Sequence, residues 1–312
     1  MISSRRGRNP RPAPRSDAMT DENDFFDMAA APMRIGIVRL KVRDLEAVSS
    51  FYRCILGLTP IAEENHCVTL GTRENPLLEL EGDIALRPRD PHEAGLFHTA
   101  FLMPSRADLS RWLTHVIEAG VPLQGASDHI VSEAIYLADP EGNGIEVYAD
   151  RPISRWRDPD GSVRMSTKPL DIPELLKVAE GSKWAGFPEG GIIGHVHLQV
   201  GNTAAADRFY RDILGFDITT RYPGASFYGS GGYHHQLAAN IWNSRGAGRR
   251  SPGMAGLDKL EIIVRDGLQV EIAARARSAG LELTSTAEGM SLTDPWGTAL
   301  TIRSEGPRLL DR

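Results

Sequence analysis

The sequence has 312 residues, enough for two domains of ordinary size that each bury a core. A hydrophobic content of 41% and a charged content of 24% are those of an ordinary globular protein and argue against a disordered or fibrous chain. The net charge of -6 favours neither nucleic acid nor anionic lipid as a partner, and no apolar run is long enough to span a bilayer. Cys54 and Cys67 are the only cysteines and make no disulfide framework, so we expect a cytoplasmic protein.

The two ends of the chain do not resemble parts of a folded core. Residues 1–32 begin with a stretch rich in arginine and proline that contains no apolar run. We expect this segment to be a disordered tail, and we expect a second, short tail at 306–312. We assign no function to either of them.

An internal repeat organises the rest of the sequence. Residues 40–58 read LKVRDLEAVSSFYRCILGL, and residues 198–216 read LQVGNTAAADRFYRDILGF, with the FYR triplet and the ILG string in common. ADPEGNGIEV at 138–147 and TDPWGTALTI at 293–302 correspond in the same way. The chain therefore contains two related halves.

Each half divides again into two modules. IGIVRLKV alternates as a strand does, and the helical spacing that follows it ends at Gly57, before further strands. The pattern predicts an α+β fold of four tandem βαβββ modules, which pair into two half-barrel domains because one small sheet cannot bury its inner face alone. The predicted domains are 33–152 and 190–305. The linker at 153–189 should carry one short helix around Pro173–Glu180.

Four strings carry a resemblance to a known family: GLFHTAFLMPSRADL, SDHIVSEAIYLADPEGNGIEVYADRP, IIGHVHLQV and GGYHHQLAANIWNSRG. They resemble strings of the vicinal-oxygen-chelate superfamily, and in particular of its two-domain catechol 2,3-dioxygenase-like branch. The similarity extends over about residues 33–305. It implies two vicinal-oxygen-chelate domains and an Fe(II)-dependent extradiol dioxygenase, which opens an aromatic ring beside a diol.

A non-haem Fe(II) oxygenase needs two histidines and one carboxylate on one side of the metal, with the other side open. The resemblance implies that such ligands lie on the first and the last strand of a module. In module order, these positions hold Ile37 and Glu79, His98 and Glu146, His195 and Gln236, and Lys259 and Thr301. His98, Glu146 and His195 thus complete the metal-binding triad only if the second and third modules share one cleft. His197 lies on the same face of its strand as His195, so the register leaves either histidine open as the ligand.

The resemblance implies further roles. Tyr136 stands ten residues before Glu146, as the family's active-site tyrosine does, and His235 matches the family's acid–base histidine. His129 matches a further pocket histidine more loosely. The candidates for contact with substrate are Tyr233, His234, Gln236 and Trp242. Gln236 is also a candidate fourth metal ligand, at the position where glyoxalase I proteins have one. Adjacent residues of a strand point to opposite faces, so we expect one of His234 and His235 to be structural.

The leading hypothesis is an extradiol dioxygenase that acts on a small aromatic diol and dioxygen. Its cofactor would be Fe(II), or else Mn(II) or another divalent metal. Two alternatives stay open: a metal-dependent isomerase or lyase of the glyoxalase I kind, with Gln236 as fourth ligand, and a metal-free protein that binds a small molecule in an apolar cleft. We expect no nucleic-acid or membrane partner, and the resemblance implies a capacity to form homo-oligomers.

Overall fold

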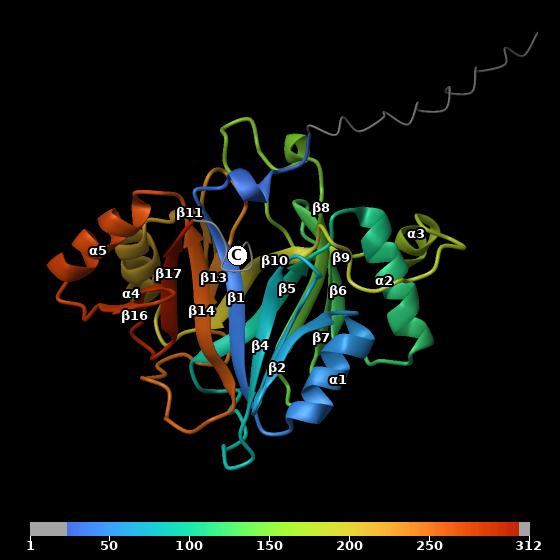
Figure 1. Ribbon diagram of the computed structural model, residues 1–312. Coiled ribbons are helices and arrows are strands. Elements are labelled where there is room, and N and C mark those ends of the chain that lie inside the picture. Colours follow the sequence, from blue (N-terminus) through green and yellow to red (C-terminus); the bar gives the residue numbers. More distant parts are fainter. Residues whose placement is uncertain (1–23, 306–312) are drawn as a thin grey trace, which may run out of the picture.

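The computed structural model describes residues 24–305, which form four successive βαβββ units (Figure 1). The first unit comprises β1 (Met33–Val42), α1 (Leu45–Ile55), β2 (Thr59–Glu64), β3 (Cys67–Gly71) and β4 (Pro76–Gly82). The second comprises β5 (Gly95–Leu102), α2 (Arg106–Glu118), β6 (Gly125–Asp128), β7 (Ser132–Ala138) and β8 (Gly144–Asp150). The third comprises β10 (Ile192–Gln199), α4 (Thr203–Asp207), the π-helical stretch η4 (Arg208–Leu214), β11 (Asp217–Tyr222), β12 (Ala225–Gly229) and β13 (Leu237–Asn240). The fourth comprises β14 (Gly256–Val264), α5 (Leu268–Ser278), β15 (Thr284–Thr286), β16 (Gly289–Thr293) and β17 (Ala299–Ser304). The predicted α+β fold of four βαβββ modules is confirmed.

The strands form two sheets, and each sheet takes strands from both halves of the chain. The eight-stranded sheet, in the order β15-β16-β17-β14-β1-β4-β3-β2, joins the first and fourth modules. The nine-stranded sheet, in the order β11-β12-β13-β10-β5-β8-β7-β6-β9, joins the second and third modules. Its two halves meet where β5 and β10 run antiparallel. The second and third modules therefore share one curved sheet, which is the arrangement that the predicted metal site requires.

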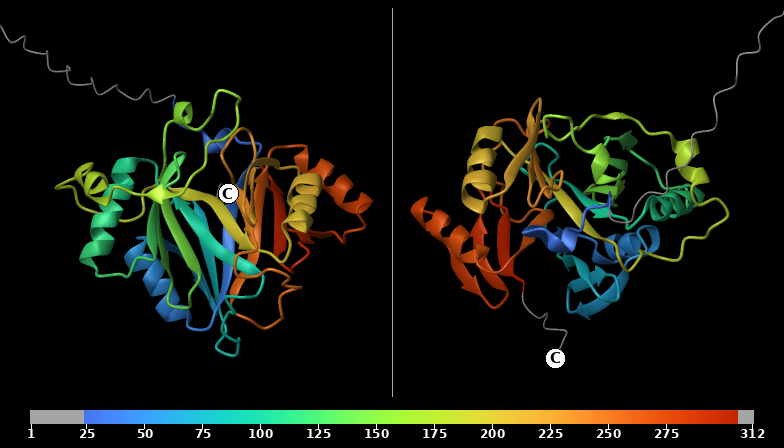
Figure 2. Two further views of the ribbon diagram at one scale, coloured as in Figure 1. Left: turned by 180° about the vertical axis from the view of Figure 1, so that it is seen from behind. Right: turned by 90° about the horizontal axis from the view of Figure 1, so that it is seen from above.

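The helices lie on the outer faces of the two sheets (Figure 2), with α1 and α2 at one end of the molecule and α4 and α5 at the other. Among the described residues, none of these helices is long and apolar enough to cross a bilayer. Buried apolar side chains from all four modules, among them Leu40, Trp112, Tyr210 and Leu260, form one continuous core. This core fixes the two sheets against their helices.

Local signals in the sequence explain where the helices begin and end. The Asp44 carboxylate accepts a hydrogen bond from the backbone N–H of Ala47 at 3.0 Å and so caps α1. The Ser105 hydroxyl caps α2 in the same way, by accepting from the N–H of Asp108 at 3.1 Å. At the other end of α1, Gly57 has a φ of 73°, a left-handed conformation that glycine adopts without strain and that ends α1.

The N-terminal tail was expected to extend to residue 32, and the structure moves that boundary. Residues 24–32 pack against the body of the protein, whereas the rest of this predicted tail and the predicted tail at 306–312 lie outside the described residues. The Phe26 ring lies 4.9 Å from the Tyr233 ring, and Met28 is buried in the short helix η2 (Met28–Ala30). These two apolar side chains bury surface that a free tail would expose, which explains the difference.

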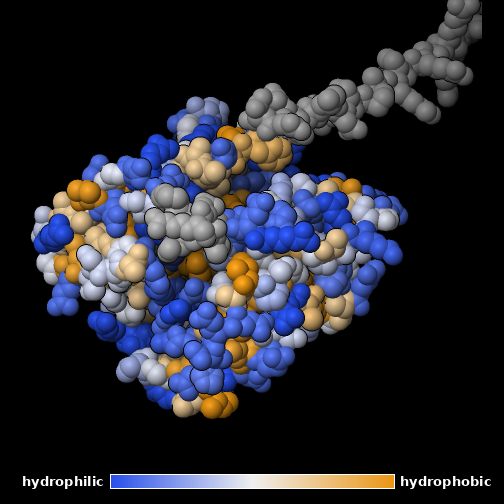
Figure 3. Space-filling model, in the orientation of Figure 1, coloured by the Kyte–Doolittle hydropathy of each residue, from blue (hydrophilic) through white to orange (hydrophobic). Residues whose placement is uncertain are grey.

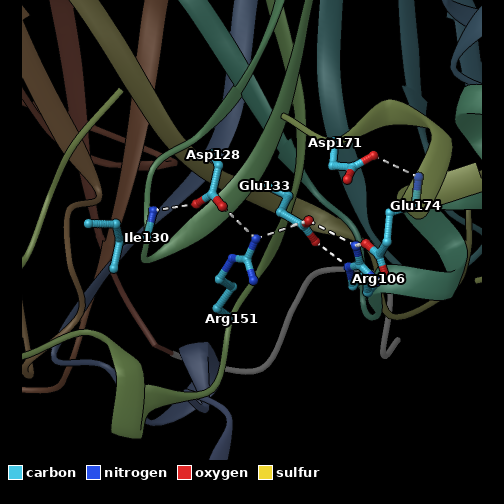
Figure 4. A network of polar contacts seen from close by, with 7 residues as sticks. All are labelled: Arg106, Asp128, Ile130, Glu133, Arg151, Asp171 and Glu174. Carbon is cyan, nitrogen blue, oxygen red and sulfur yellow. Dashed lines mark hydrogen bonds and ion pairs between the residues drawn. The ribbon is translucent and has the colours of Figure 1, made fainter. Parts of the chain in front are cut away.

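The connector between the two halves is tied to the nine-stranded sheet. It contains η3 (Ile153–Arg155), the short edge strand β9 (Lys168–Pro169) and the helix α3 (Ile172–Lys177), close to the helix expected from the sequence. Figure 4 shows Arg106 of α2 between Glu133 of β7 and Glu174 of α3. Arg151 also pairs with Glu133, at 3.1 Å. Since Glu133 is buried, both guanidinium groups compensate a carboxylate that water cannot reach.

Candidate metal centre

Three predicted ligands meet at the centre of the nine-stranded sheet. His98 of β5 and His195 of β10 come from antiparallel neighbours, and Glu146 comes from β8 on the other side of β5. The Nε2 atoms of His98 and His195 lie 2.9 and 3.2 Å from the same carboxylate oxygen of Glu146. One ligand atom from each residue lies within 4.8 Å of the other two, and all three side chains are buried. The site is therefore assembled from both halves of the chain.

Two glycines allow the strands that carry these ligands to approach. Gly144 lies opposite His98, and a Cβ at Gly144 would stand 2.0 Å from the carbonyl oxygen of Phe97. Gly194 precedes His195, and a Cβ there would stand 1.8 Å from the Tyr148 hydroxyl. A larger residue at either position would force β8 or β10 to shift, and a ligand would shift with it.

The donor set fits a divalent metal ion. The His98 Nε2 lies near Glu146 without the geometry of a hydrogen bond, and the Nδ1 of His195 has no partner within the described chain. Such buried, unpartnered nitrogens are costly unless something else binds at the site. Two imidazoles and one carboxylate are also the ligands that a non-haem iron site uses.

The protonation states of the site also suit a metal. Burial alone would raise the pKa of Glu146, but the two imidazoles beside it outweigh that effect and hold the pKa well below its usual range. Burial lowers the pKa of His195 to about 4, although Glu146 opposes the shift. At neutral pH the carboxylate is therefore ionised and His195 is neutral. These are the forms that bind metal.

Tyr136 and His129 lie side by side at the edge of the triad. Tyr136 of β7 lies directly opposite Glu146 of β8. The His129 Nδ1 donates to the carbonyl oxygen of Ser166 at 2.8 Å, because a carbonyl can only accept. The His129 Nε2 is then left without a proton and accepts from the Tyr136 hydroxyl at 2.7 Å. Burial and the Glu146 charge raise the pKa of Tyr136 well above its usual value, so the phenol stays protonated.

His235 lies against the triad and is oriented from behind. Its ring centroid lies 4.2 Å from that of His195, and its Nδ1 lies 2.8 Å from the Nδ1 of His234. The Nε2 of His234 donates to the Asp150 carboxylate at 2.9 Å. With the His234 proton on Nε2, the contact between the two Nδ1 atoms needs a proton from His235, so His235 donates from Nδ1 and leaves Nε2 as an acceptor.

Three of the predicted substrate contacts lie away from the cavity beside the triad. His234 bonds to Asp150, and the Tyr233 hydroxyl bonds to the Tyr148 hydroxyl at 2.8 Å. The Gln236 amide accepts from the N–H of Ser230 at 2.7 Å and donates to its carbonyl at 3.1 Å. Tyr233, His234 and Gln236, which were predicted to contact substrate, therefore do not line this cavity.

The strand register explains why Gln236 lies away from the triad. Glu146 pairs with Ala100, two residues after His98. The residue that pairs with His197, two residues after His195, is Ala238. Gln236 therefore lies two residues before the position equivalent to that of Glu146, and Ala238 offers no ligand atom.

A cavity of about 300 Å³ opens beside the triad. Its wall includes the predicted residues His98, His129, Tyr136, Glu146, His195, His235 and Trp242. The sequence reasoning missed the other wall residues, which are Phe97, Ser127, Ser132, Met165, Ser166, Thr167, Thr220, Tyr222 and Phe227, and it considered His197 only as an alternative ligand. Alternation along β11 and β12 could have indicated Thr220, Tyr222 and Phe227. No pattern in the sequence indicated that the connector would supply Met165 to Thr167.

His197 does not belong to the triad, although it lines the same cavity. Its Nε2 accepts a hydrogen bond from the Asn240 amide at 3.0 Å. Its ring lies between those of His98 and Trp242, with centroids at 5.0 and 5.5 Å. The structure thus favours His195 over His197 as the histidine nearest to Glu146.

The sheet of the first and fourth modules has a larger cleft, of about 540 Å³, at the corresponding place. The face of the molecule over β1, β4 and β14 is largely hydrophilic (Figure 3). The charged side chains of this cleft pair with one another, as Arg39 does with Glu79 at 2.7 Å and Arg303 with Glu261 at 2.8 Å. Within residues 24–305, only the triad of the other sheet groups ligands for a metal. The larger cleft is therefore not the candidate metal site.

Known proteins are similar to this chain over both of its halves. The model of the Glyoxalase/Bleomycin resistance protein/Dioxygenase superfamily matches residues 34–147 and 192–300. The chain is 38% identical over 268 residues to the catechol-2,3-dioxygenase of Bacillus subtilis (strain 168), covering 84% of this chain and 93% of that protein. It is 29% identical over 180 residues to biphenyl-2,3-diol 1,2-dioxygenase 2 of Rhodococcus globerulus, covering 54% of this chain and 90% of that protein.

Solved structures show the same fold. A putative dioxygenase from Bacillus subtilis subsp. subtilis str. 168 has a TM-score of 0.58 at 13% identity, covering 88% of this chain and 86% of that one. Glyoxalase I from Zea mays has a TM-score of 0.54 at 14% identity, covering 87% of this chain and 92% of that one. At these identities the likeness concerns the fold alone. By its repeats and its relatives, the chain belongs to the glyoxalase/bleomycin resistance protein/dioxygenase superfamily, in the branch that contains its catechol-2,3-dioxygenase relative.

Proposed function

We propose that this protein is an extradiol dioxygenase that cleaves a small aromatic diol with dioxygen. The observation that carries the proposal is the buried convergence of His98, His195 and Glu146 beside a cavity lined by aromatic side chains. The likeness to a catechol-2,3-dioxygenase over 93% of that relative's length supports the same reaction class.

In this proposal His98, His195 and Glu146 hold one divalent metal ion, Fe(II) or else Mn(II). When bound, the metal would bring the diol and dioxygen together and let electrons pass between them. The chain itself supplies a single negative charge from Glu146 and two neutral nitrogen donors. The cavity beside the triad would give the two reactants space to reach such a metal.

His235 is the proposed acid–base group. Asp150 and His234 keep the proton of His235 on Nδ1, so Nε2 is available to accept the proton of a diol hydroxyl. Ring cleavage adds both atoms of dioxygen to the diol, with no net gain or loss of protons. The proton that His235 accepts must therefore return to the product, which requires a weak base such as imidazole.

Tyr136 and His129 form a donor and acceptor pair in the cavity wall. The Tyr136 phenol has one proton, which His129 accepts in the structure described, so it donates to an oxygen of the bound diol by turning its O–H away from His129. Because burial and the Glu146 charge raise the pKa of Tyr136, the phenol keeps its proton at neutral pH. We propose that this pair orients the diol and stabilises negative charge on its oxygen.

The structure gives no support to the alternative of a glyoxalase-type isomerase. That reading placed Gln236 as fourth ligand, and the Gln236 side chain is bound to the backbone of Ser230 instead. The alternative of a metal-free binding protein gives no reason for the buried cluster of His98, Glu146 and His195. Both readings are distinguished from ours by the experiment below.

The test is oxygen consumption by the Fe(II)-loaded protein with a panel of diols. Wild-type protein should consume one dioxygen per diol and form a ring-opened product that absorbs visible light. His235→Gln should lower kcat by about 100-fold or more, because general acid–base groups contribute that much. As a matched control, His92→Gln should leave kcat unchanged, since His92 is exposed and outside the cavity. If no diol is consumed, or if an isomerase substrate is converted without oxygen, the proposal is wrong.

A further inference from the structure

The cavity beside the triad has a wall of aromatic rings. Phe97 and Trp242 lie with ring centroids 5.5 Å apart, and Phe227 lies 5.1 Å from His235. Tyr222 and Met165 extend the same wall. A group that enters this space loses water and meets ring faces and a thioether, which favour apolar groups.

No lysine or arginine of residues 24–305 lines the cavity. Arg221 lies between the wall residues Thr220 and Tyr222, but strand alternation turns it outward, where it pairs with Asp207 at 3.0 Å. Lys168 follows Thr167 in sequence and is exposed. A carboxylate on a ring whose diol faces the triad would therefore find no cationic side chain among the wall residues.

The cavity is also larger than one ring requires. Its volume is about 300 Å³, whereas a cavity of about 150 Å³ accommodates benzene. Even beside a metal ion and dioxygen, an unsubstituted catechol would leave part of the space unfilled. A substituent on the ring could occupy that space and bury further apolar surface.

We infer that the substrate is a diol whose ring carries an uncharged, apolar substituent, and that the cavity discriminates against carboxylated diols. This inference rests on the proposed dioxygenase function and names the substrate class of the same site. The aromatic wall accommodates the substituent, and the absence of a cation among the wall residues makes a carboxylate costly to bury.

The test uses a pair of diols that differ in charge but not in shape. 4-Isopentylcatechol carries a branched alkyl chain, and 3-(3,4-dihydroxyphenyl)propanoate replaces its terminal isopropyl group by a carboxylate. We expect kcat/KM of the Fe(II)-loaded protein to be at least about 100-fold higher for the alkyl compound than for the carboxylate. We also expect kcat/KM to be about tenfold higher for the alkyl compound than for catechol, since each well-buried methylene contributes to binding.

A variant that adds a cation to the cavity wall tests whether the lack of a cationic side chain there causes the discrimination against the carboxylate. Tyr222 is 56% exposed, so Tyr222→Arg should not disturb the core. This variant should lower the ratio of kcat/KM for the alkyl compound to kcat/KM for the carboxylate by about tenfold. As the control, Val270→Arg adds the same charge on α5, outside the cavity, and should leave the ratio unchanged.

The outcomes separate this inference from the proposed function. Turnover of both isosteres at equal kcat/KM, or faster turnover of the carboxylate, would overturn the inference and leave the dioxygenase function intact. A ratio that Tyr222→Arg and Val270→Arg change equally would also overturn it, because the cavity wall would not be its cause. If catechol is consumed and neither isostere is, only the inference is wrong; if none of the three diols is consumed, the proposed function is wrong as well.

Discussion

Glu146 and Glu79 allow a matched test of the metal site within one molecule. Both residues lie on the last strand of their module, at equivalent positions: Glu146 pairs with Ala100 and Glu79 pairs with Arg39 on the first strand. Glu146 faces two imidazoles, whereas Glu79 pairs with Arg39 in the other sheet. Glu146→Gln should remove the only charged metal ligand, and Glu79→Gln should leave the metal site intact.

The magnitude follows from binding linkage. At a free Fe(II) concentration of about 100 times Kd, metal binding stabilises the folded protein by about 2.7 kcal/mol. Loss of the Glu146 carboxylate should raise Kd by about 100-fold or more, at least as much as loss of an outer partner of a metal ligand does. At the same metal concentration the stabilisation then falls to about 0.4 kcal/mol.

Anaerobic thermal unfolding with and without Fe(II) measures this difference. The wild type and Glu79→Gln should gain roughly 5–10 °C in Tm with metal, and Glu146→Gln should gain roughly 1–2 °C. The metal-free Glu146→Gln protein should be somewhat less stable than the metal-free wild type, because the two imidazoles hold the pKa of Glu146 below its usual range, so the metal-induced gain is compared within each protein. An equal metal-induced gain in Glu146→Gln and the wild type would refute the reasoning.

Three further outcomes are expected. The pKa of His195 is about 4 in the folded protein and 6.5 when unperturbed, so between these values only the unfolded state is protonated. The unfolding free energy of the metal-free protein should therefore fall as pH falls through this window, by about 3 kcal/mol from this group, and less steeply in His195→Gln. Arg106→Met should cost about 2–4 kcal/mol in denaturant unfolding, because it leaves the buried Glu133 with one guanidinium partner fewer. Gly144→Ala should lower both Tm and Fe(II) affinity, because its Cβ would meet the carbonyl of Phe97 at 2.0 Å.

Much of the fold was predictable because the sequence repeats itself. The FYR triplet of the first half recurs in the second, and the paired turns after Ala138 and Thr293 mark the same place in two modules. Repetition of this kind reports a repeated unit directly, without any need to judge single strands. The order of strand and helix in all four modules followed from it.

The pairing of the modules could not be read from the repeat. First-strand histidines stand only in the second and third modules, and that pattern made a shared sheet a condition of the metal site. A pairing of adjacent modules would have satisfied the local patterns equally well, because strand alternation says nothing about which edges join. The antiparallel contact of β5 with β10 is a long-range feature that only the structure shows.

The positions of Tyr233, His234 and Gln236 outside the cavity have one physical origin. They lie in a turn before β13, where backbone geometry no longer follows the alternation of a strand. His235 lines the cavity from the same turn. The residues beside it were predicted to contact substrate because they are close to His235 in sequence. The connector residues Met165 and Thr167 reach the cavity from a segment without periodic pattern, which gives sequence reasoning no basis for prediction.

The account depends on one metal ion held jointly by the two halves of the chain. An anomalous difference map at the iron edge, from crystals of the Fe(II)-loaded protein grown without oxygen, tests this most directly. The account predicts one peak about 2.0–2.2 Å from a nitrogen of His98, a nitrogen of His195 and a carboxylate oxygen of Glu146. A fully loaded crystal with its iron elsewhere, for example in the cleft of the first and fourth modules, would contradict it.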